Sequence, residues 1–402
     1  MNRFIDWVDD RFPLRETIRY HLTEYYAPKN FNFFYFFGSL ALLVLVIQIL
    51  SGIWLTMHYK PDAALAFASV EHIMRDVHYG WLIRYMHSTG ASAFFIVIYL
   101  HMFRGLMYGS HRGPRELLWL IGMLIFLVLM AEAFMGYVLP WGQMSYWGAQ
   151  VIINLFTAIP FYGPELAEWI RGGFSISDPT LNRLFAFHVV GVPIVLIILV
   201  FIHLVALHDV GSNNPDGIEI KKNKDDNGVP KDGIPFHPYY TVKDLFAVMV
   251  FLFICAVVMF YYPTVFGIFL EHDNFKPANP LQTPTHIKPV WYFGTFYAIL
   301  RAVPDKLTGV VLMALSIALL FVLPWLDRSK VKSWRYRPIY KQMLLVFAVS
   351  FLVLMYLGGQ PATKTYTMFA RIFTVLYFAF FIALPFVSKW EKPKPVPDRV
   401  TG

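Results

Sequence analysis

Residues 87–101 read HSTGASAFFIVIYLH and residues 188–203 read HVVGVPIVLIILVFIH, and these two apolar stretches decide the fold. Each begins and ends with a histidine, at spacings of 14 and 15 residues. At about 1.5 Å and 100° per residue, such spacings put both imidazoles of a stretch on nearly one helix face, about 21–22 Å apart. Two such helices laid antiparallel would bring the histidines together at two depths. The facing pairs would be His87 with His188 and His101 with His203.

Two imidazoles that face each other can hold one iron between them, so the four histidines predict two b-type haems at two depths of a membrane. The alternative is that each histidine is a hydrogen-bonded packing residue. Ionisable side chains inside a bilayer are costly and usually functional, and four at matched depths favour ligation.

Glycines repeat with a similar spacing on the neighbouring apolar stretches. Gly38 and Gly52 are 14 residues apart before the first histidine pair, and Gly122 and Gly136 are 14 apart after it. Since glycine lacks a side chain, it allows a bulky group to approach the backbone. We interpret the repeat as room for two flat macrocycles. The alternative is ordinary packing of small residues between membrane helices.

Composition predicts an all-α polytopic membrane protein: 57% of the 402 residues are hydrophobic and 15% are charged. Eight stretches have about the length that a transmembrane helix needs. The first four would form a four-helix bundle that holds the two haems. The expected spans are residues 34–57, 82–107, 117–138, 184–207, 245–266, 307–326, 340–358 and 367–387.

The parts of the chain around these spans give the expected domain organisation. An amphipathic N-terminal segment would precede the bundle, a cytoplasmic loop would follow it, and an outer loop rich in proline and aromatic residues would lie within the C-terminal helices. The expected divisions are 1–33, the segment; 34–209, the bundle; 210–244, the loop; 245–388, the C-terminal region with its outer loop 271–306; and 389–402, a disordered tail.

The basic residues are unevenly divided between the two sides of the expected spans. One side carries 23 of the 34 Lys and Arg, and the other carries 11. The positive-inside rule therefore predicts that both termini are cytoplasmic. The net charge of +8 is explained by orientation and by contacts with the lipid membrane, so it implies no nucleic acid.

Two arginines lie three residues from expected ligands: Arg84 before His87 and Arg104 after His101. Three residues is a neighbouring distance on a helix, so each guanidinium could reach a haem propionate. The alternative is that each arginine extends to the membrane surface. The chain has one cysteine, Cys255, and no Cys-x-x-Cys-His motif, so we expect the haems to be bound non-covalently.

Nearly the whole chain resembles cytochrome b of the bacterial type, the core subunit of quinol–cytochrome c reductase (respiratory complex III). The motifs that carry the resemblance are the histidine quartet, Gly136-Tyr137-Val138-Leu139-Pro140-Trp141-Gly142-Gln143, Gly211-Ser212-Asn213-Asn214-Pro215 and His237-Pro238-Tyr239-Tyr240-Thr241-Val242-Lys243-Asp244. The resemblance implies bifurcated quinol oxidation at an outer site, electron transfer across the membrane through two haems, and quinone reduction at an inner site, with proton translocation.

The resemblance also implies site residues and partners. The partners would be a Rieske-type iron–sulfur protein and a cytochrome c-type subunit, in a homodimeric complex of the bacterial inner membrane, with ubiquinone as the quinone. The outer quinol site would contain Phe134, Tyr137, Gly148, Pro289, Tyr292 and Tyr297, and the inner quinone site Ser39, His208, Lys243 and Asp244.

Two features depart from the family's pattern. Val290 stands where the family motif usually has a glutamate, and valine cannot accept a proton. We expect Glu132 to supply the carboxylate by reaching the outer pocket from the opposite wall; the alternative is that it pairs with an arginine or caps a polar contact. The gap between His188 and His203 is one residue longer than usual in the respiratory family, and we expect a kink or a π-bulge near residues 188–193 to absorb it.

Two other functions remain as alternatives. A transporter would need inverted repeats with paired broken helices, which the sequence does not suggest. A di-haem membrane anchor, which only passes electrons between quinone and a partner dehydrogenase, would need one quinone site. Polar residues at both faces favour the reductase.

Overall fold

The computed structural model describes residues 2–401, and of Asn2 and His21 the backbone alone. Within this range, eight helical segments are long and apolar enough to span a membrane, as the sequence predicts. They are α3 with its preceding turn (Phe33–Thr56), α5 (Gly80–Tyr108), α6 (Glu116–Val138), α9 with α10 (Asp178–Val210), α11 (Phe236–Tyr261), α13 (Lys306–Leu326), α14 (Pro338–Gly358) and α15 (Lys364–Trp390).

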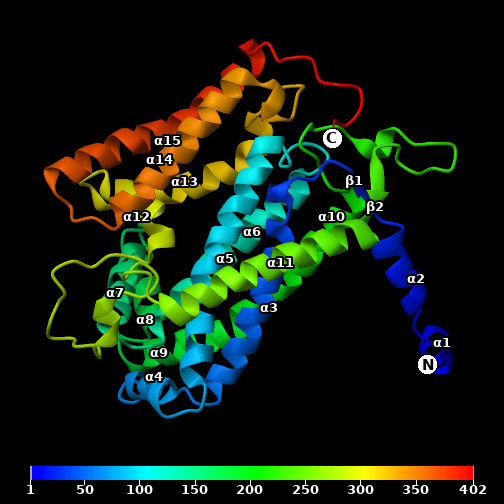
Figure 1. The fold of residues 1–402 in the computed structure, drawn as a ribbon. Coiled ribbons are helices and arrows are strands. Elements are labelled where there is room, and N and C mark those ends of the chain that lie inside the picture. Colours follow the sequence, from blue (N-terminus) through cyan, green and yellow to red (C-terminus); the bar gives the residue numbers. More distant parts are fainter. Residues whose placement is uncertain (1, 402) are drawn as a thin grey trace.

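The first four spans pack as two pairs. Helix α3 (Phe37–Thr56) lies along α5, and α6 lies along α10 (Val192–Val210), so that each pair joins one glycine helix to one histidine helix. Helix α11 crosses the outside of α3 and α5 (Figure 1). Long apolar side chains such as Phe95, Phe126 and Leu129 fill the interior.

The last three spans form a second group. Helices α13, α14 and α15 lie side by side, with the short α12 (Gly294–Arg301) packed against them, and they contact the bundle through α6 and α5 (Figure 1). Apolar contacts bury Leu344, Leu354 and Tyr377 completely, so this group has a core that is continuous with the bundle.

Short elements cover the two ends of the bundle. At one end lie α4 (Ala66–Arg75), α7 (Gln143–Phe156), α8 (Gly163–Arg171) and α9 (Asp178–Ala186). At the other end lie α1 (Asn2–Asp9), α2 (Leu14–Ile18), a π-helical turn (Arg19–Thr23) and the two-stranded sheet of β1 (Tyr26–Pro28) and β2 (Gly233–Pro235), which pairs antiparallel (Figure 1). Single 3-10 turns occur at Phe33–Tyr35, Ile220–Lys222, His272–Phe275, Trp291–Phe293 and Trp334–Tyr336.

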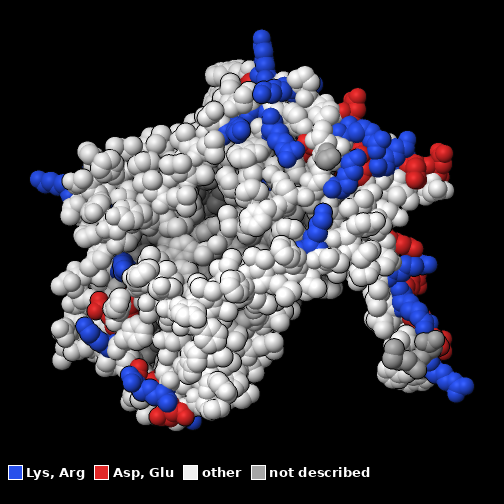
Figure 2. Space-filling model, in the orientation of Figure 1, with Lys and Arg blue, Asp and Glu red and all other residues white. Residues whose placement is uncertain are grey.

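Charged residues gather near these two ends. Figure 2 shows Lys, Arg, Asp and Glu side chains at the top and along the right, over the end with the termini, and at the lower left, over α4 and its neighbours. The face between them is almost free of charge in this view. An uncharged belt between two charged ends is what a bilayer requires of a multi-pass protein.

The longer histidine spacing is absorbed where the sequence predicts it. Residues Phe187–Gly191 form a π-helical turn, and Val192–Val210 continue as α-helix. A π turn holds one residue more than an α turn, so the extra residue is taken up next to His188 and His203 keeps its direction. The prediction of a π-bulge near 188–193 is confirmed.

The C-terminal tail differs from the expectation of disorder. Arg399 forms an ion pair of 2.8 Å with Asp232, and the Thr401 hydroxyl donates to Asp216 at 2.9 Å. Both carboxylates are buried, so they need partners, and the tail supplies them. The end of the tail is therefore fixed against the loop 211–235.

Candidate functional site

Both histidine pairs meet inside the bundle. The ring centroids are 6.1 Å apart for His87 and His188, and 6.5 Å apart for His101 and His203. A metal–nitrogen bond of about 2.0 Å, with each ring centre about 1.1 Å behind its nitrogen, places two imidazoles on opposite sides of one ion about 6.2 Å apart. Both pairs therefore have the separation that one iron between two imidazoles requires.

Each of the four glycines faces one imidazole. A Cβ at Gly52 would lie 3.2 Å from His87 Cε1, and one at Gly136 would lie 2.4 Å from His188 Cε1. At the other depth, a Cβ at Gly38 would lie 3.4 Å from His101, and one at Gly122 would lie 3.2 Å from His203. The glycines thus make room for the imidazoles, and the space for a macrocycle lies between the paired rings.

The second ring nitrogen of three histidines has a polar neighbour. His87 Nδ1 is 2.9 Å from Ser51 Oγ, His188 Nδ1 is 3.0 Å from the carbonyl oxygen of Glu132, and His101 Nδ1 is 3.5 Å from Arg104. The hydroxyl oxygen of Ser51 and the carbonyl oxygen of Glu132 can each accept a hydrogen bond from Nδ1–H, which sets the tautomer of His87 and His188 and leaves Nε2 free to bind a metal. Arg104 is a donor, so it does not set this tautomer for His101. The Nδ1 of His203 is buried without a hydrogen bond among the described residues.

A cavity of about 680 Å³ surrounds the pair His87–His188. Cofactor pockets have volumes of about 300–1,000 Å³, so this cavity suits a haem. Its lining includes Gly52, Gly136 and the cationic side chain of Arg84. At the other depth, Arg104 is stacked on the ring of Tyr35 at 4.9 Å, and its Nε is buried without a partner among the described residues, as an anion-binding group would be.

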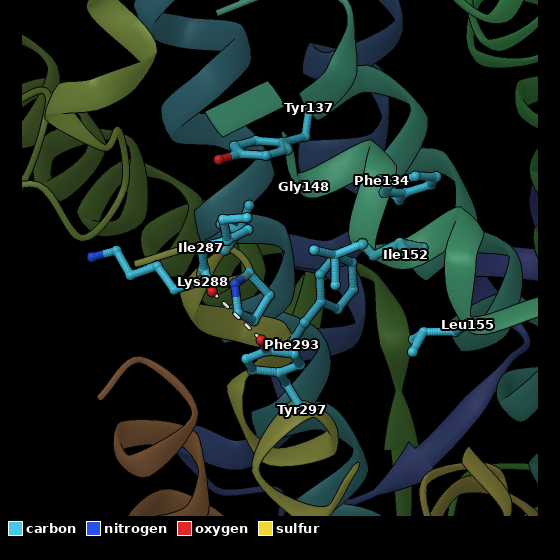
Figure 3. Close-up of a pocket in the computed structure, with 12 residues that line it drawn as sticks. Phe134, Tyr137, Gly148, Ile152, Leu155, Ile287, Lys288, Phe293 and Tyr297 are labelled. Carbon is cyan, nitrogen blue, oxygen red and sulfur yellow. Dashed lines mark hydrogen bonds between the residues drawn. The ribbon is translucent and has the colours of Figure 1, made fainter. Parts of the chain in front are cut away.

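A smaller pocket of about 30 Å³ lies beside this cavity, between α6, α7 and the loop before α12 (Figure 3). Such a volume holds only one or two water molecules, so a quinol ring would enter only if the lining side chains moved apart. The pocket brings together five of the expected outer-site residues. They are Phe134, Tyr137, Gly148, Pro289 and Tyr297.

Two expected outer-site residues lie elsewhere. Tyr292 lines the larger cavity, stacked on Phe95 at 3.9 Å. Glu132 also lines the larger cavity, with its Oε1 3.0 Å from His188 Nδ1, and it does not line the smaller pocket. We expect Glu132 to point toward a cavity bounded by Pro289, Tyr292 and Tyr297, but the structure divides these residues: Glu132 lines the larger cavity with Tyr292 and does not line the smaller pocket of Pro289 and Tyr297. The expectation that it reaches the outer quinol pocket is therefore wrong, because its position four residues before Gly136 puts both on the face that meets His188.

The expected inner-site residues lie at the end of the bundle where the termini are. The hydroxyl of Ser39 on α3 donates to Asp244 Oδ2 on α11 at 3.0 Å. His208, on the last turn of α10, packs its ring against Tyr25 at 4.6 Å. The ammonium of Lys243 lies 5.3 Å from the ring of Tyr240. The structure thus joins Ser39 to Asp244 directly and places His208 at the same end of the bundle.

Sequence reasoning missed several residues of these sites. Ser51 holds the ring of His87, and Gln48 donates to the carbonyl oxygen of His87 at 2.9 Å. Glu271 accepts a hydrogen bond from the hydroxyl of Tyr137. Polar residues in an apolar span were the available signal for Ser51 and Gln48. For Glu271, the sequence carries no signal that points to Tyr137.

Comparisons with known proteins show the family of this chain. The family model "Cytochrome b/b6/petB" matches residues 22–211, and "Cytochrome b(C-terminal)/b6/petD" matches residues 277–378. This chain belongs to the cytochrome b family. Cytochrome b of Allochromatium vinosum is 65% identical over 99% of this chain and 98% of its own length, and that of Rhodospirillum rubrum is 53% identical over 100% and 96%.

A solved structure with the same fold belongs to a hyperthermophilic respiratory complex III. It superposes with a TM-score of 0.90 at 41% identity, over 96% of this chain and 99% of that one. As a cytochrome b, the chain is a multi-pass membrane protein, the core catalytic subunit of quinol–cytochrome c reductase, and it binds two b-type haems and quinone. The paired imidazoles and the 680 Å³ cavity fit the haems.

Proposed function

We propose that His87 and His188 ligate one haem iron and that His101 and His203 ligate the other. The centroid separations of 6.1 and 6.5 Å are the observation that supports this assignment most strongly. When bound, the two haems carry single electrons between the two depths. In this proposal Arg84 and Arg104 bind propionates, and the four glycines keep the imidazoles in place.

The quinol is oxidised in the smaller pocket, which we assign as the outer site. Phe134, Pro289 and Tyr297 give it an apolar wall, which suits the quinol ring. Tyr137 and Val290 line both this pocket and the larger cavity, so a ring in the pocket would be close to the haem held by His188. A short distance between the quinol ring and this haem favours electron transfer from one to the other.

The quinone is reduced at the opposite end of the bundle, beside Ser39, His208 and Asp244. An imidazole and a carboxylate can hydrogen-bond the two carbonyl oxygens of a quinone and supply protons to them. The 3.0 Å bond from Ser39 to Asp244 holds this carboxylate between α3 and α11. Lys243 lies next in the chain and adds positive charge.

We further propose that this end faces the cytoplasm of a bacterium, that both termini lie there, and that the protein is in the inner membrane. The excess of Lys and Arg at this end supports the orientation.

The complex III neighbour supports a Rieske-type iron–sulfur protein and a cytochrome c-type subunit as partners, in a homodimeric complex. The "Cytochrome b/c1" of Bradyrhizobium diazoefficiens, which is 47% identical over 57% of its own length, also supports a cytochrome c1-type partner. We propose ubiquinone as the quinone.

Variants at the two quinone sites test this proposal in the purified complex. Gly148→Leu extends a side chain into the smaller pocket, and we expect quinol-driven reduction of the haems through the outer site to fall on the order of 10²-fold. Asp244→Asn should instead slow reoxidation of the haems by quinone at the inner site. Both haem spectra should stay unchanged. Normal outer-site reduction in Gly148→Leu would contradict the assignment of the pocket.

A further inference from the structure

Quinol oxidation releases two protons, and the outer pocket offers few groups that can accept one. Of its lining residues, only Tyr137, Lys288 and Tyr297 carry an ionisable group. A protonated lysine cannot accept a proton, and in Figure 3 the Lys288 side chain extends away from the pocket. The hydroxyl of Tyr297 donates to the carbonyl oxygen of Ile287 at 3.4 Å. Tyr137 remains.

The hydroxyl of Tyr137 is hydrogen-bonded to a carboxylate. Tyr137 is in the last turn of α6, and its hydroxyl donates to Oε2 of Glu271, which lies in the loop between α11 and α12. Only 6% of Glu271 is exposed. A tyrosine alone is a poor proton acceptor, but a tyrosine that can pass its own proton to a carboxylate is a good one.

The surroundings of Glu271 suit a group that takes up and releases a proton. Burial raises the pKa of this carboxyl above its usual range, and Asp273 adds to the rise, while the hydrogen bond from Tyr137 and the charge of Lys288 oppose it. Tyr292 is the other ionisable group that faces it. Exposed residues flank it: Asp273 forms an ion pair of 3.6 Å with Lys276, and both side chains are more than half exposed. A proton on Glu271 is thus close to external water.

We propose that Tyr137 and Glu271 form a proton relay from the outer quinol pocket to the outer surface, with Tyr137 as the catalytic residue and Glu271 as the residue that positions it and accepts its proton. This inference rests on the assignment of the smaller pocket as the outer site.

The step balances in atoms and electrons. As a quinol O–H bond breaks, its proton bonds to the Tyr137 oxygen, and the Tyr137 proton bonds to Oε2 of Glu271. The electrons of the quinol go to the two acceptors of the established reaction. Glu271 then releases its proton to external water and takes back its hydrogen bond from Tyr137, which restores the starting state.

The relay explains how a quinol in this pocket can lose a proton although Val290 stands where the family motif usually has a glutamate. Val290 is 5% exposed and carries no proton. Two carboxylates line the larger cavity: Glu132 lies against His188, and Glu71 pairs with Arg75. Within the described part of the chain, Glu271 is thus the carboxylate that contacts the pocket's wall, through Tyr137.

Glu271→Gln in the intact complex tests the relay. Glutamine keeps the hydrogen bond from Tyr137 but cannot accept a proton at neutral pH. With the inner site blocked by an inhibitor, we expect the rate constant of quinol-driven haem reduction at saturating quinol to fall about tenfold or more, with the half-saturating quinol concentration changed less than about twofold. Glu271→Asp should recover part of the rate, and haem spectra and midpoint potentials should stay unchanged.

The pH profile separates the relay from a structural role. In the unaltered protein the outer-site rate should fall on the acid side as Glu271 becomes protonated; in Glu271→Gln this fall should disappear. Tyr137→Phe with Glu271→Gln should be no slower than the slower single variant, because both remove one relay. Glu165→Gln, which changes an exposed carboxylate on α8, is the control and should behave as the unaltered protein.

Two results would overturn the relay: a normal rate in Glu271→Gln, or a slowed variant that keeps the acid limb of its pH profile. Gly148→Leu distinguishes this failure from a failure of the outer-site assignment. If Gly148→Leu blocks quinol oxidation while Glu271→Gln does not slow it, the pocket is correct and the relay is wrong. If Gly148→Leu is normal, the pocket itself is wrongly assigned.

Discussion

The ring of His188 is held by Glu132 in two ways. The carbonyl oxygen and the carboxylate Oε1 of Glu132 both lie 3.0 Å from Nδ1 of His188. The second carboxylate oxygen is buried without a hydrogen bond among the described residues. A carboxylate on the far nitrogen of a metal-binding imidazole increases its basicity and favours the more positive, oxidised metal.

We therefore predict that Glu132→Gln raises the midpoint potential of one haem by tens of millivolts, where about 59 mV is a tenfold change for one electron. The other haem should keep its potential. A redox titration followed by haem absorbance measures both. Glu165→Gln, on the exposed surface of α8, is the control and should shift neither. Equal shifts of both haems would show that Glu132 acts from a distance and not through His188.

The four glycines leave different amounts of room. A Cβ at Gly136 would be 2.4 Å from the ring of His188, closer than atoms can approach, whereas one at Gly38 would be 3.4 Å from His101. We predict that Gly136→Ala displaces His188 and reduces occupancy of its haem by half or more, while Gly38→Ala retains both haems. The pyridine haemochrome content per complex measures occupancy. Full occupancy in Gly136→Ala would contradict the prediction.

At this scale the sequence predicts the ligands but not their neighbours. Spacing along a helix places His87, His101, His188 and His203 in facing pairs because a helix has a fixed period. The same period places Glu132 on the face of Gly136, and thus beside His188. The prediction that Glu132 reaches the outer pocket did not take this into account. The carboxylate that does contact the pocket's wall, Glu271, is in a loop, where no period applies.

At the scale of elements, the π-helical turn Phe187–Gly191 sets the direction of everything after it in α10. It takes up about 100° of rotation that a regular helix would otherwise add before His203. Val190 is in this turn and is 56% exposed, so its side chain contributes little to the interior.

Deletion of Val190 should therefore be tolerated. We predict that the deletion converts the turn to regular α-helix and keeps both haems, since the spacing becomes the 14 residues of the partner helix. Insertion of an alanine after Ile197, in the regular part of α10, should turn His203 away by about 100° and remove its haem. Spectra of reduced minus oxidised complex report both. Loss of both haems on deletion would show that the turn is needed for folding.

At the scale of the whole molecule, charged groups at the end with the termini join the bundle to the C-terminal helices. Glu219, in the loop after α10, forms ion pairs of 2.6 Å with Arg115 before α6 and 2.5 Å with Lys332 before α14. Close by, Arg337 is fully buried between Asp327, at 2.6 Å, and Glu391, at 3.1 Å. Removing one partner from such a cluster leaves a buried charge uncompensated.

The hydrogen bonds and charges of Arg115 and Lys332 lower the pKa of Glu219 to about 2, although burial alone would raise it. A lowered carboxyl pKa stabilises the fold above its unfolded pKa of about 4.3, and this stabilisation is lost as pH falls toward 2. We predict that Glu219→Gln lowers Tm by several degrees, equally at every pH from 5 to 8. Thermal unfolding of the purified complex measures this, with the exposed Asp226→Asn as control. A difference that varies between pH 5 and 8 would contradict the assigned pKa.

The spans and the charged ends could be predicted from the sequence because hydropathy and charge are local properties of the chain. Contacts between distant loops could not. Glu271 meets Tyr137 across 134 residues, and Arg399 meets Asp232 across 167. Such contacts depend on how the helices pack against one another, and no local sequence pattern predicts that packing. The sequence therefore predicts a disordered tail, although the buried Asp232 and Asp216 bind Arg399 and Thr401 of the tail.

In the proposed ligation, two facing histidine pairs hold two haems at two depths. The most direct test is a redox titration of the purified complex, followed by reduced-minus-oxidised spectra, in the unaltered protein and in His203→Leu. The unaltered protein should show two b-type components of equal amplitude, each with one electron. His203→Leu should lose one component and retain the other, with quinol still reducing the remaining haem through the outer pocket. Two components at full amplitude in His203→Leu would contradict the proposed ligation.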